Sequence, residues 1–277
     1  MSTTATPAFS GPTGPDADRP TDTAVPELLR RDWIAGLEKG LAILEAFGEA
    51  RPRMTAAQMG ERVGMTRTAA RRHLLTLTHL GYVASDGKLF WLAPRVLRLG
   101  QAFLESSRLA RIVQPFLQRV TAGTHEIAYL SAMDGDDIVY VARNGPNRAM
   151  NTGFVMGARV PAHVTASGML MLTLREHPPA SQWLKTAHLS TYTSHTITDR
   201  AQLQDEFARI RQQDWAISEQ QLELNYRGIA VPLRDSKGQL LGALSVTMPI
   251  GQETTDNALG RVLNVLRETA QALRPLI

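Results

Sequence analysis

The sequence predicts an α+β fold in two parts, an N-terminal winged helix-turn-helix and a C-terminal domain built around an antiparallel sheet. Three observations support this prediction. Two short helical segments flank a glycine turn at Gly64, and the second segment begins with arginines. An Asp86-Gly87 hairpin signal follows that segment. From residue 126 onward, predicted strands that pair in hairpins alternate with predicted helices, and the last predicted element is a helix. This arrangement is typical of α+β domains.

The first two helices follow from spacing and capping signals. Residues 34–49 repeat apolar side chains every three or four positions, the spacing of one helix face. Arg51-Pro52-Arg53 interrupts this pattern. Thr55 then precedes a second helix, over 56–63, and Gln58 stands three residues on as its capping-box partner.

The third helix and the hairpin after it complete the predicted winged domain. Thr66 is expected to cap the third helix, and Gly81 is expected to end it. Two β-prone runs within 82–92 then flank the Asp86-Gly87 turn and form a wing, with Lys88 at its tip.

A further helix is expected from Pro94 to about residue 107, with apolar residues on one stripe. It is interpreted as a domain linker, a dimer contact, or both. The alternative is a helix that packs only on its own domain.

The C-terminal part is expected to mix helices with antiparallel strands. Two strands surround an acidic turn within 126–145, a further strand covers 149–155, and a long hairpin over 229–248 turns at Lys237-Gly238. The expected helices cover residues 111–121, 165–174, 201–213 and 255–273.

Composition excludes several classes of protein. Cysteine is absent from the 277 residues, which rules out disulfides and cysteine-ligated zinc and suits the cytoplasm. No metal site is predicted, and no run of 18 apolar residues suggests a membrane span. Residues 1–32 begin with a stretch rich in Thr, Pro, Gly and Asp that lacks the features of a secretory signal, and they are expected to form a disordered tail.

The positive charge is concentrated in the predicted winged domain. Residues 36–108 contain 11 basic and 6 acidic side chains, whereas residues 109–277 contain 16 and 15. A localised basic surface attracts polyanions. Charge alone fits a solvated basic face equally well, but charge together with the motif favours double-stranded DNA as partner.

The start of the third helix is the predicted DNA-reading surface. Arginine can bind guanine bidentately, and threonine can hydrogen-bond a base or contact a thymine methyl. Arg67, Thr68 and Arg71 are expected to reach base edges, Arg72 to contact phosphate, and Lys88 to lie near the backbone. Thr66 completes the predicted DNA-binding set.

Catalytic motifs are weak, so the sequence is not expected to be an enzyme. His125-Glu126 begins like a zinc-protease motif, but Tyr129 stands where the second histidine ligand belongs. His163, Ser167 and Asp199 could form a triad, yet no nucleophile elbow surrounds the serine. Two alternatives remain open: a small-molecule enzyme with an appended basic DNA-binding module, and a constitutive architectural DNA binder.

The assembled motifs resemble the IclR family of bacterial transcription regulators. The resemblance runs from about residue 33 to residue 248 and beyond into the closing helix. It rests on GLEKGLAILEAF, TAAQMGERVGMTRTAARRHLLTLTHLGYV and LAPRVLRLGQAFL in the first half, and on DGDDIVYVARN, GARVPAHVTASGML and YRGIAVPLRDSKGQLLGALSV in the second. TRTAARRHLLTLTHLGYV and PRVLRLG look most like the PcaR/PobR-type subgroup, which controls aromatic-acid catabolism.

The resemblance implies a domain order and a ligand. It implies a winged helix-turn-helix, placed over 33–93, and a GAF-like effector-binding domain, placed over 109–277; the disordered tail over 1–32 and the linker helix over 94–108 complete the predicted order. It also implies homodimers that can pair into tetramers, no cofactor, and a small organic-acid effector such as 4-hydroxybenzoate, protocatechuate or β-ketoadipate. The effector-binding residues carried over are Ala166, Ser167, Ser218, Glu219, Gly228, Ser245 and Thr247. Ser218 and Gly228 stand where some relatives carry an acidic group and a cysteine, so the pocket chemistry differs.

These positions suit an organic acid. Backbone amides at a helix start favour a carboxylate, and Ser245 and Thr247 alternate on a strand and so share one face. Met169 and Tyr129 are expected to supply apolar wall. His163 is either a capping or core histidine or a residue that lines the pocket. Each hydroxyl could instead be an ordinary buried group with a backbone partner.

Overall fold

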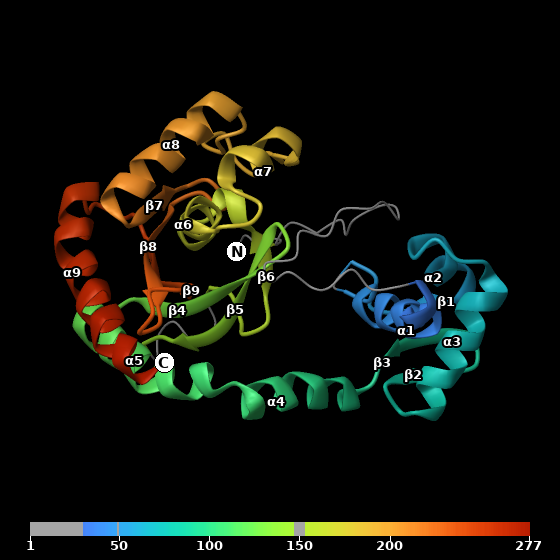
Figure 1. Ribbon diagram of the computed structural model, residues 1–277. Helices are drawn as coiled ribbons and strands as arrows, with labels where there is room; N and C mark the ends of the chain where they lie inside the picture. Colours follow the sequence, from blue (N-terminus) through green and yellow to red (C-terminus); the bar gives the residue numbers. More distant parts are fainter. Residues whose placement is uncertain (1–29, 49, 147–152) are drawn as a thin grey trace. The chain divides into compact units, whose positions relative to one another are not determined.

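The computed structural model describes residues 30–48, 50–146 and 153–277 (Figure 1). It divides into two compact units, and the division falls within helix α4 (Leu97–Ser106), after Phe103.

The N-terminal unit contains three helices and a small sheet. The helices are α1 (Ala35–Glu45), α2 (Ala56–Arg62) and α3 (Arg67–His79). Strands β1 (Met54–Thr55), β2 (Val83–Ser85) and β3 (Leu89–Leu92) form an antiparallel sheet in the order β1-β3-β2. Short 3-10 helices, Arg30–Asp32 and Pro94–Val96, lie before α1 and before α4. The predicted winged helix-turn-helix is confirmed.

The core of this unit explains its shape. Buried side chains from the three helices meet buried side chains from the wing strands, and the set includes Ile43, Met59, Leu74, Val83 and Phe90. The two-residue strand β1 was not predicted. It forms because Met54 pairs with Phe90 and Thr55 with Leu89, a long-range pairing with no local sequence signal.

The C-terminal unit is built on a six-stranded antiparallel sheet in the order β6-β5-β4-β9-β8-β7. The strands are β4 (Ile127–Asp134), β5 (Asp137–Asn144), β6 (Arg159–Pro161), β7 (Ala216–Glu219), β8 (Tyr226–Arg234) and β9 (Leu240–Pro249). The α+β prediction is confirmed. The predicted strand over 149–155 is wrong for its described part, 153–155, and the rest of it lies outside the described residues.

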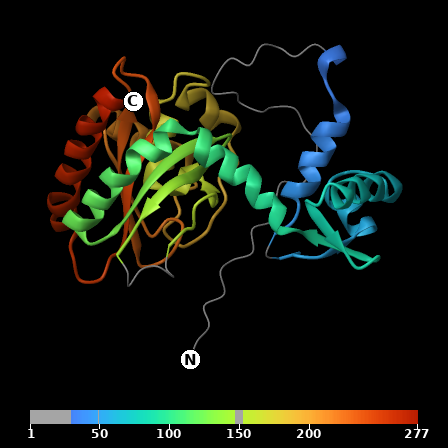
Figure 2. The same ribbon diagram turned by 90° about the horizontal axis from the view of Figure 1, so that it is seen from below.

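Helices cover both faces of this sheet (Figures 1 and 2). Helices α5 (Arg108–Thr124) and α9 (Thr255–Leu273) pack on one face. Helix α6 (Ala166–Leu174) packs on the other, preceded by a 3-10 turn, Ala162–Val164, and joined by α7 (Ala180–Thr186) and α8 (Arg200–Gln213). A last 3-10 turn, Arg274–Leu276, follows α9.

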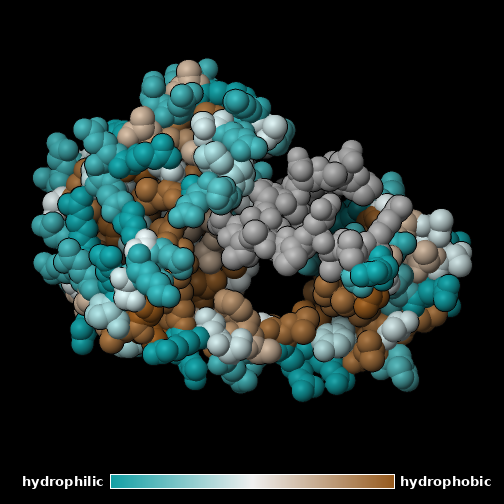
Figure 3. Space-filling view, viewed as in Figure 1, coloured by the Kyte–Doolittle hydropathy of each residue, from teal (hydrophilic) through white to brown (hydrophobic). Residues whose placement is uncertain are grey.

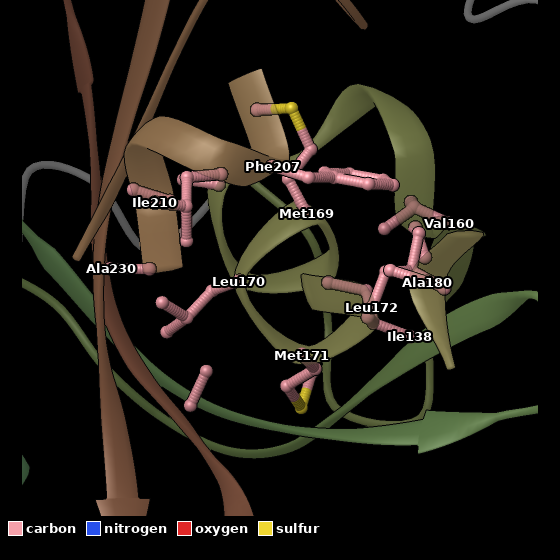
Figure 4. Close-up of a cluster of buried hydrophobic side chains, with 14 of the residues drawn as sticks. Ile138, Val160, Met169, Leu170, Met171, Leu172, Ala180, Phe207, Ile210 and Ala230 are labelled. Atoms are coloured by element: carbon pink, nitrogen blue, oxygen red, sulfur yellow. The ribbon is translucent and has the colours of Figure 1, made fainter. Parts of the chain in front are cut away.

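Strand alternation sorts side chains between the two faces. On β9, Leu244 and Val246 join the core under α5 and α9, so Ser245 and Thr247 face the side of α6. Helix α6 is apolar on all sides and buried from Ala166 to Thr173, because the sheet lies on one side of it and α8 on the other. Figure 4 shows this packing, with Leu170 near Ile210 of α8 and Ala230 of β8.

Candidate functional site

The turn between α2 and α3 fixes the helix-turn-helix geometry. Gly64 adopts a positive φ of 66°, and the backbone N–H of Met65 donates to the carbonyl of Gly60 at 2.8 Å, which is a Schellman ending for α2. A Cβ on Gly60 would lie 2.7 Å from the Met65 carbonyl oxygen. The two helices therefore meet as closely as glycine permits, which sets the start of α3.

Helix α3 presents its polar face to solvent. Thr66 caps the helix, since its hydroxyl accepts from the backbone N–H of Ala69 at 3.2 Å. Ala70, Leu74 and Leu77 face the core. The four residues of this helix that are predicted to contact DNA are all exposed: Arg67, Thr68, Arg71 and Arg72.

Positive charge on this helix start is not neutralised within the described part of the chain. Arg67, Arg71 and Arg72 form no ion pair there. Leu75 is 46% exposed and lies on the same helix face as Thr68 and Arg71. Leu75 is not among the residues that the sequence analysis singled out. An exposed leucine on such a face can contact a thymine methyl.

The wing turn is held by its own carboxylate. Oδ1 of Asp86 accepts from the backbone N–H groups of Lys88 at 3.0 Å and Leu89 at 2.8 Å. Backbone hydrogen bonds, those from Leu89 and Lys88 first, lower the pKa of Asp86, and the charge of Arg53 adds to them. Gly87 takes a positive φ of 96°. Lys88 is exposed at the tip.

The C-terminal unit contains a cavity on the α6 side of its sheet. It encloses about 60 Å³ that water can occupy, and it opens partly to solvent. Six of the predicted effector residues line it: Ala166, Ser167, Ser218, Gly228, Ser245 and Thr247.

The polar groups of the cavity are unequal in their freedom to bind a ligand. The Ser218 hydroxyl already donates to the carbonyl of Val164 at 2.9 Å. By contrast, the hydroxyls of Ser167, Ser245 and Thr247 have no hydrogen-bond partner among the described residues. These three hydroxyls are available to an incoming polar ligand.

The start of α6 adds backbone donors to the same cavity. Thr165 caps the helix by accepting from the N–H of Gly168 at 3.0 Å. The N–H groups of Ala166 and Ser167 have no protein acceptor among the described residues. Gly168 cannot be replaced without movement, because a Cβ there would lie 2.2 Å from the Ala162 carbonyl oxygen. This close packing holds the free amides at the cavity wall, where a helix start favours an anion.

Aromatic side chains form one wall, but they are not the predicted ones. Tyr140 and Phe154 line the cavity and stack with ring centroids 5.3 Å apart at 14°. Tyr129 lies behind them, with its ring 4.4 Å from Tyr140 and its hydroxyl accepting from the Phe154 N–H at 3.1 Å. Met169 is buried in the α6 core and does not line the cavity. Burial raises the pKa of Tyr140, so its hydroxyl stays protonated as a donor.

Two predicted effector residues lie away from the cavity. His163 is buried, its Nε2 lies 3.1 Å from the carbonyl oxygen of Ser190, and burial lowers its pKa. Glu219 binds the guanidinium of Arg227 and accepts from the Thr255 hydroxyl at 2.9 Å. Ser218 and Glu219 are neighbours on a strand, so their side chains point to opposite faces, and the sequence resemblance had placed both at the cavity.

A buried arginine accounts for the position of Glu219. Arg227 is 3% exposed and donates to Glu219, to the Thr255 hydroxyl at 3.2 Å and to the carbonyls of Glu253 and Thr254. Its guanidinium therefore ties β7 and β8 to the start of α9. Arg227 also lines the cavity, but its guanidinium is already bound by these partners.

The residues considered for catalysis are not assembled. Asp199 caps α8 through Oδ1, which accepts from the Gln202 N–H at 2.8 Å, and His163 hydrogen-bonds neither Asp199 nor Ser167. Within residues 30–48, 50–146 and 153–277, no cluster of acidic or histidine side chains suited to a metal is found. Helices in the same ranges are all too short or too polar to cross a bilayer.

A cationic helix-turn-helix with a wing, joined in one chain to a domain whose cavity is lined by unpaired hydroxyls and amides, defines the class of a ligand-responsive DNA-binding protein. Two family models match the chain: the IclR helix-turn-helix domain over residues 36–87, and the bacterial transcriptional regulator IclR C-terminal over residues 101–274. The chain belongs to the IclR family of transcriptional regulators.

Individual relatives are similar over most of the length. The Pca operon regulatory protein of Acinetobacter baylyi is 34% identical, covering 90% of this chain and 91% of its own. The p-hydroxybenzoate hydroxylase transcriptional activator of the same species is 36% identical, covering 91% and 94%. A structure of the inducer binding domain of a PobR double mutant from Acinetobacter, with 3-hydroxybenzoic acid, is 28% identical and covers 62% of this chain and all of that one, with a TM-score of 0.58.

Proposed function

We propose that this regulator binds operator DNA through α3 and the wing, and that its C-terminal cavity binds a small aromatic carboxylate of the 4-hydroxybenzoate or protocatechuate type. The single observation that carries the effector proposal is the group of free donors at one cavity. The amides of Ala166 and Ser167 and the hydroxyls of Ser167, Ser245 and Thr247 have no partner in the described chain.

The chemistry of these groups fits each part of such a ligand. Charge-assisted hydrogen bonds from amides and hydroxyls suit a carboxylate. The stacked Tyr140 and Phe154 rings offer an aromatic face to the ring of the ligand. Two relatives named as regulators of the pca operon and of p-hydroxybenzoate hydroxylase support the same class of acid, as does the relative crystallised with 3-hydroxybenzoic acid.

The ligand acts by binding the two DNA-binding states of the protein unequally. An effector shifts such an equilibrium only by its difference in affinity for the two states. The acid therefore changes operator affinity, and DNA changes affinity for the acid by the same factor.

Ligand stabilisation tests the effector proposal. Thermal unfolding is followed with 4-hydroxybenzoate, protocatechuate, β-ketoadipate and 4-hydroxybenzamide, which lacks the carboxylate. At a concentration of 100 Kd the ligand stabilises the native state by about 2.7 kcal/mol. A raised Tm with the acids and none with the amide supports the proposal. No shift with any aromatic acid supports a purely architectural DNA binder, and turnover of an acid supports an enzyme.

We also propose that the protein acts in the cytoplasm as a homodimer, or as a pair of dimers, on a two-part operator. Dimers of helix-turn-helix proteins place two recognition helices one helical turn apart. Exposed apolar side chains on α1 and α4 support a contact between copies, since Leu37 is 60% and Leu97 is 75% exposed. Figure 3 shows apolar residues at the surface. In this proposal segment 94–108 is both linker and dimer contact. Analytical sedimentation of wild type and of Leu37→Glu tests the contact through α1. A dimeric mass for the variant would contradict that role of α1.

A further inference from the structure

The chain that leads into α2 carries an arginine beside the wing. In the β1–β3 ladder Met54 pairs with Phe90 and Thr55 with Leu89. Extending that register by one residue sets Arg53 opposite Trp91. Met54 and Phe90 are buried in the core, so the alternate residues Arg53 and Trp91 lie on the outer face of the wing sheet.

Arg53 is held on the aromatic ring and keeps its hydrogen-bonding edge free. Its Cζ lies 4.4 Å from the centroid of the Trp91 ring. Stacking on an aromatic face orients a guanidinium without using its N–H donors. Across the residues that the structure describes, Arg53 forms no ion pair and no hydrogen bond. An exposed, oriented and unpaired guanidinium is suited to an oxyanion.

Asp86, the acidic residue of the wing turn, forms no ion pair with Arg53. The charge of Arg53 reaches Asp86, where it adds to the backbone hydrogen bonds that lower the pKa of that carboxyl. Oδ1 of Asp86, however, is committed to the N–H groups of Lys88 and Leu89 in the wing turn. Arg53 therefore retains its donors for a partner outside the chain.

The register also places Arg53 alongside the wing tip. Trp91 follows Lys88 by three residues, which corresponds to about 10 Å along a strand. Arg53, beside β3, and Lys88, in the turn before β3, are thus two exposed cations on the wing sheet. An open hollow borders the Arg53–Trp91 pair and includes Phe47 and Pro52.

We propose that Arg53, oriented by Trp91, binds a phosphate of the DNA backbone beyond the contact made by the wing tip. This inference rests on the proposed operator binding and adds a contact outside α3 and the wing turn. Such a contact fixes the register of the protein on the duplex and reads no bases. Its partner is a DNA phosphate, and an acidic protein partner would leave DNA affinity unchanged in the test below.

The test is the salt dependence of DNA affinity. Operator and random duplexes are titrated between 50 and 200 mM salt with wild type, Arg53→Gln and Lys185→Gln. Lys185 is exposed on α7, so its variant removes the same charge from the other unit. One phosphate contact contributes about 0.9 to the slope of log K against log salt. Between 50 and 200 mM salt, the factor by which the affinity of Arg53→Gln falls should therefore be about 3.5 times smaller than the factor for wild type.

The affinities themselves give a second readout. At 50 mM salt Arg53→Gln should bind operator and random DNA about tenfold more weakly, and Lys185→Gln should match wild type. Trp91→Leu keeps the charge and removes the stack, so its affinity should fall about two- to fivefold with little change in slope. An unchanged slope for Arg53→Gln, or an unchanged affinity for Trp91→Leu, would overturn the proposal. A wild type that does not prefer its operator would instead contradict the proposed function.

Discussion

Replacing Ser245 by alanine should separate ligand binding from folding. Ser245 is 4% exposed, lines the cavity, and has a hydroxyl with no partner among the described residues. A fully buried hydroxyl without a partner destabilises the folded state by about 1–3 kcal/mol. The Ser245 oxygen faces the cavity, so the effect is smaller. We expect the free energy of unfolding without ligand to stay constant or to rise by up to about 1 kcal/mol.

The same substitution should weaken binding of an aromatic carboxylate. A hydrogen bond to a charged group contributes about 1.5–3 kcal/mol. A loss of about 2 kcal/mol raises Kd about thirtyfold. At a ligand concentration of 100 times the wild-type Kd, stabilisation then falls from about 2.7 to about 0.9 kcal/mol. For a unit of this size the ligand-induced rise in Tm should shrink from about 5–11 °C to about 2–4 °C.

Calorimetric titration of 4-hydroxybenzoate, together with thermal unfolding, measures both effects. Ser218→Ala is the matched control, because the Ser218 hydroxyl lines the same cavity and is bound to the Val164 carbonyl. It should lower the Tm without ligand by leaving that carbonyl unpaired, and change Kd by less than about threefold. The reasoning fails if Ser245→Ala keeps the wild-type Kd, or if it destabilises the unliganded protein as much as Ser218→Ala does.

The remaining predictions concern DNA reading, packing and pH. Arg71→Ala should cost about 1–3 kcal/mol at one operator position and relax base preference there, as measured by binding to single-base operator variants; uniform weakening on all sequences would mark Arg71 as a phosphate contact. Gly168→Ala should destabilise the C-terminal unit by about 3 kcal/mol or more in urea melts, because the added Cβ meets the Ala162 carbonyl; a wild-type midpoint would contradict this packing. Burial lowers the pKa of His163 in the folded state, so the unfolded chain binds the proton first and stability should fall as pH drops below about 6.5. His163→Gln should flatten that pH dependence, and an equally steep profile in the variant would assign the titration to another group.

Local signals were sufficient for much of the fold. Thr55 with Gln58 forms the predicted capping box, Thr66 caps α3, and Gly81 takes the positive φ that ends it. These features are encoded within a few residues of one another. Strand β1 and the edge strand β7 escaped prediction because each is short and is defined by a distant partner, Phe90 and Leu89 for β1 and β8 for β7.

The cavity was predicted in outline but not in detail. Strand alternation correctly paired Ser245 with Thr247, since period two is a local property. Glu219 lies elsewhere because a buried arginine, Arg227, binds it on the other face of the strand, and no local pattern reports that partner. The aromatic wall came from Tyr140 rather than Tyr129, a choice that only the packing of two adjacent strands decides.

Footprinting of the DNA upstream of the protein's own coding region, with and without 4-hydroxybenzoate, measures operator binding and its response to the acid in one experiment. We expect protection of two half-sites about one helical turn apart, with a strength or extent that changes when the acid is added. Protection no greater than on random DNA, in both the presence and the absence of the acid, would contradict this expectation.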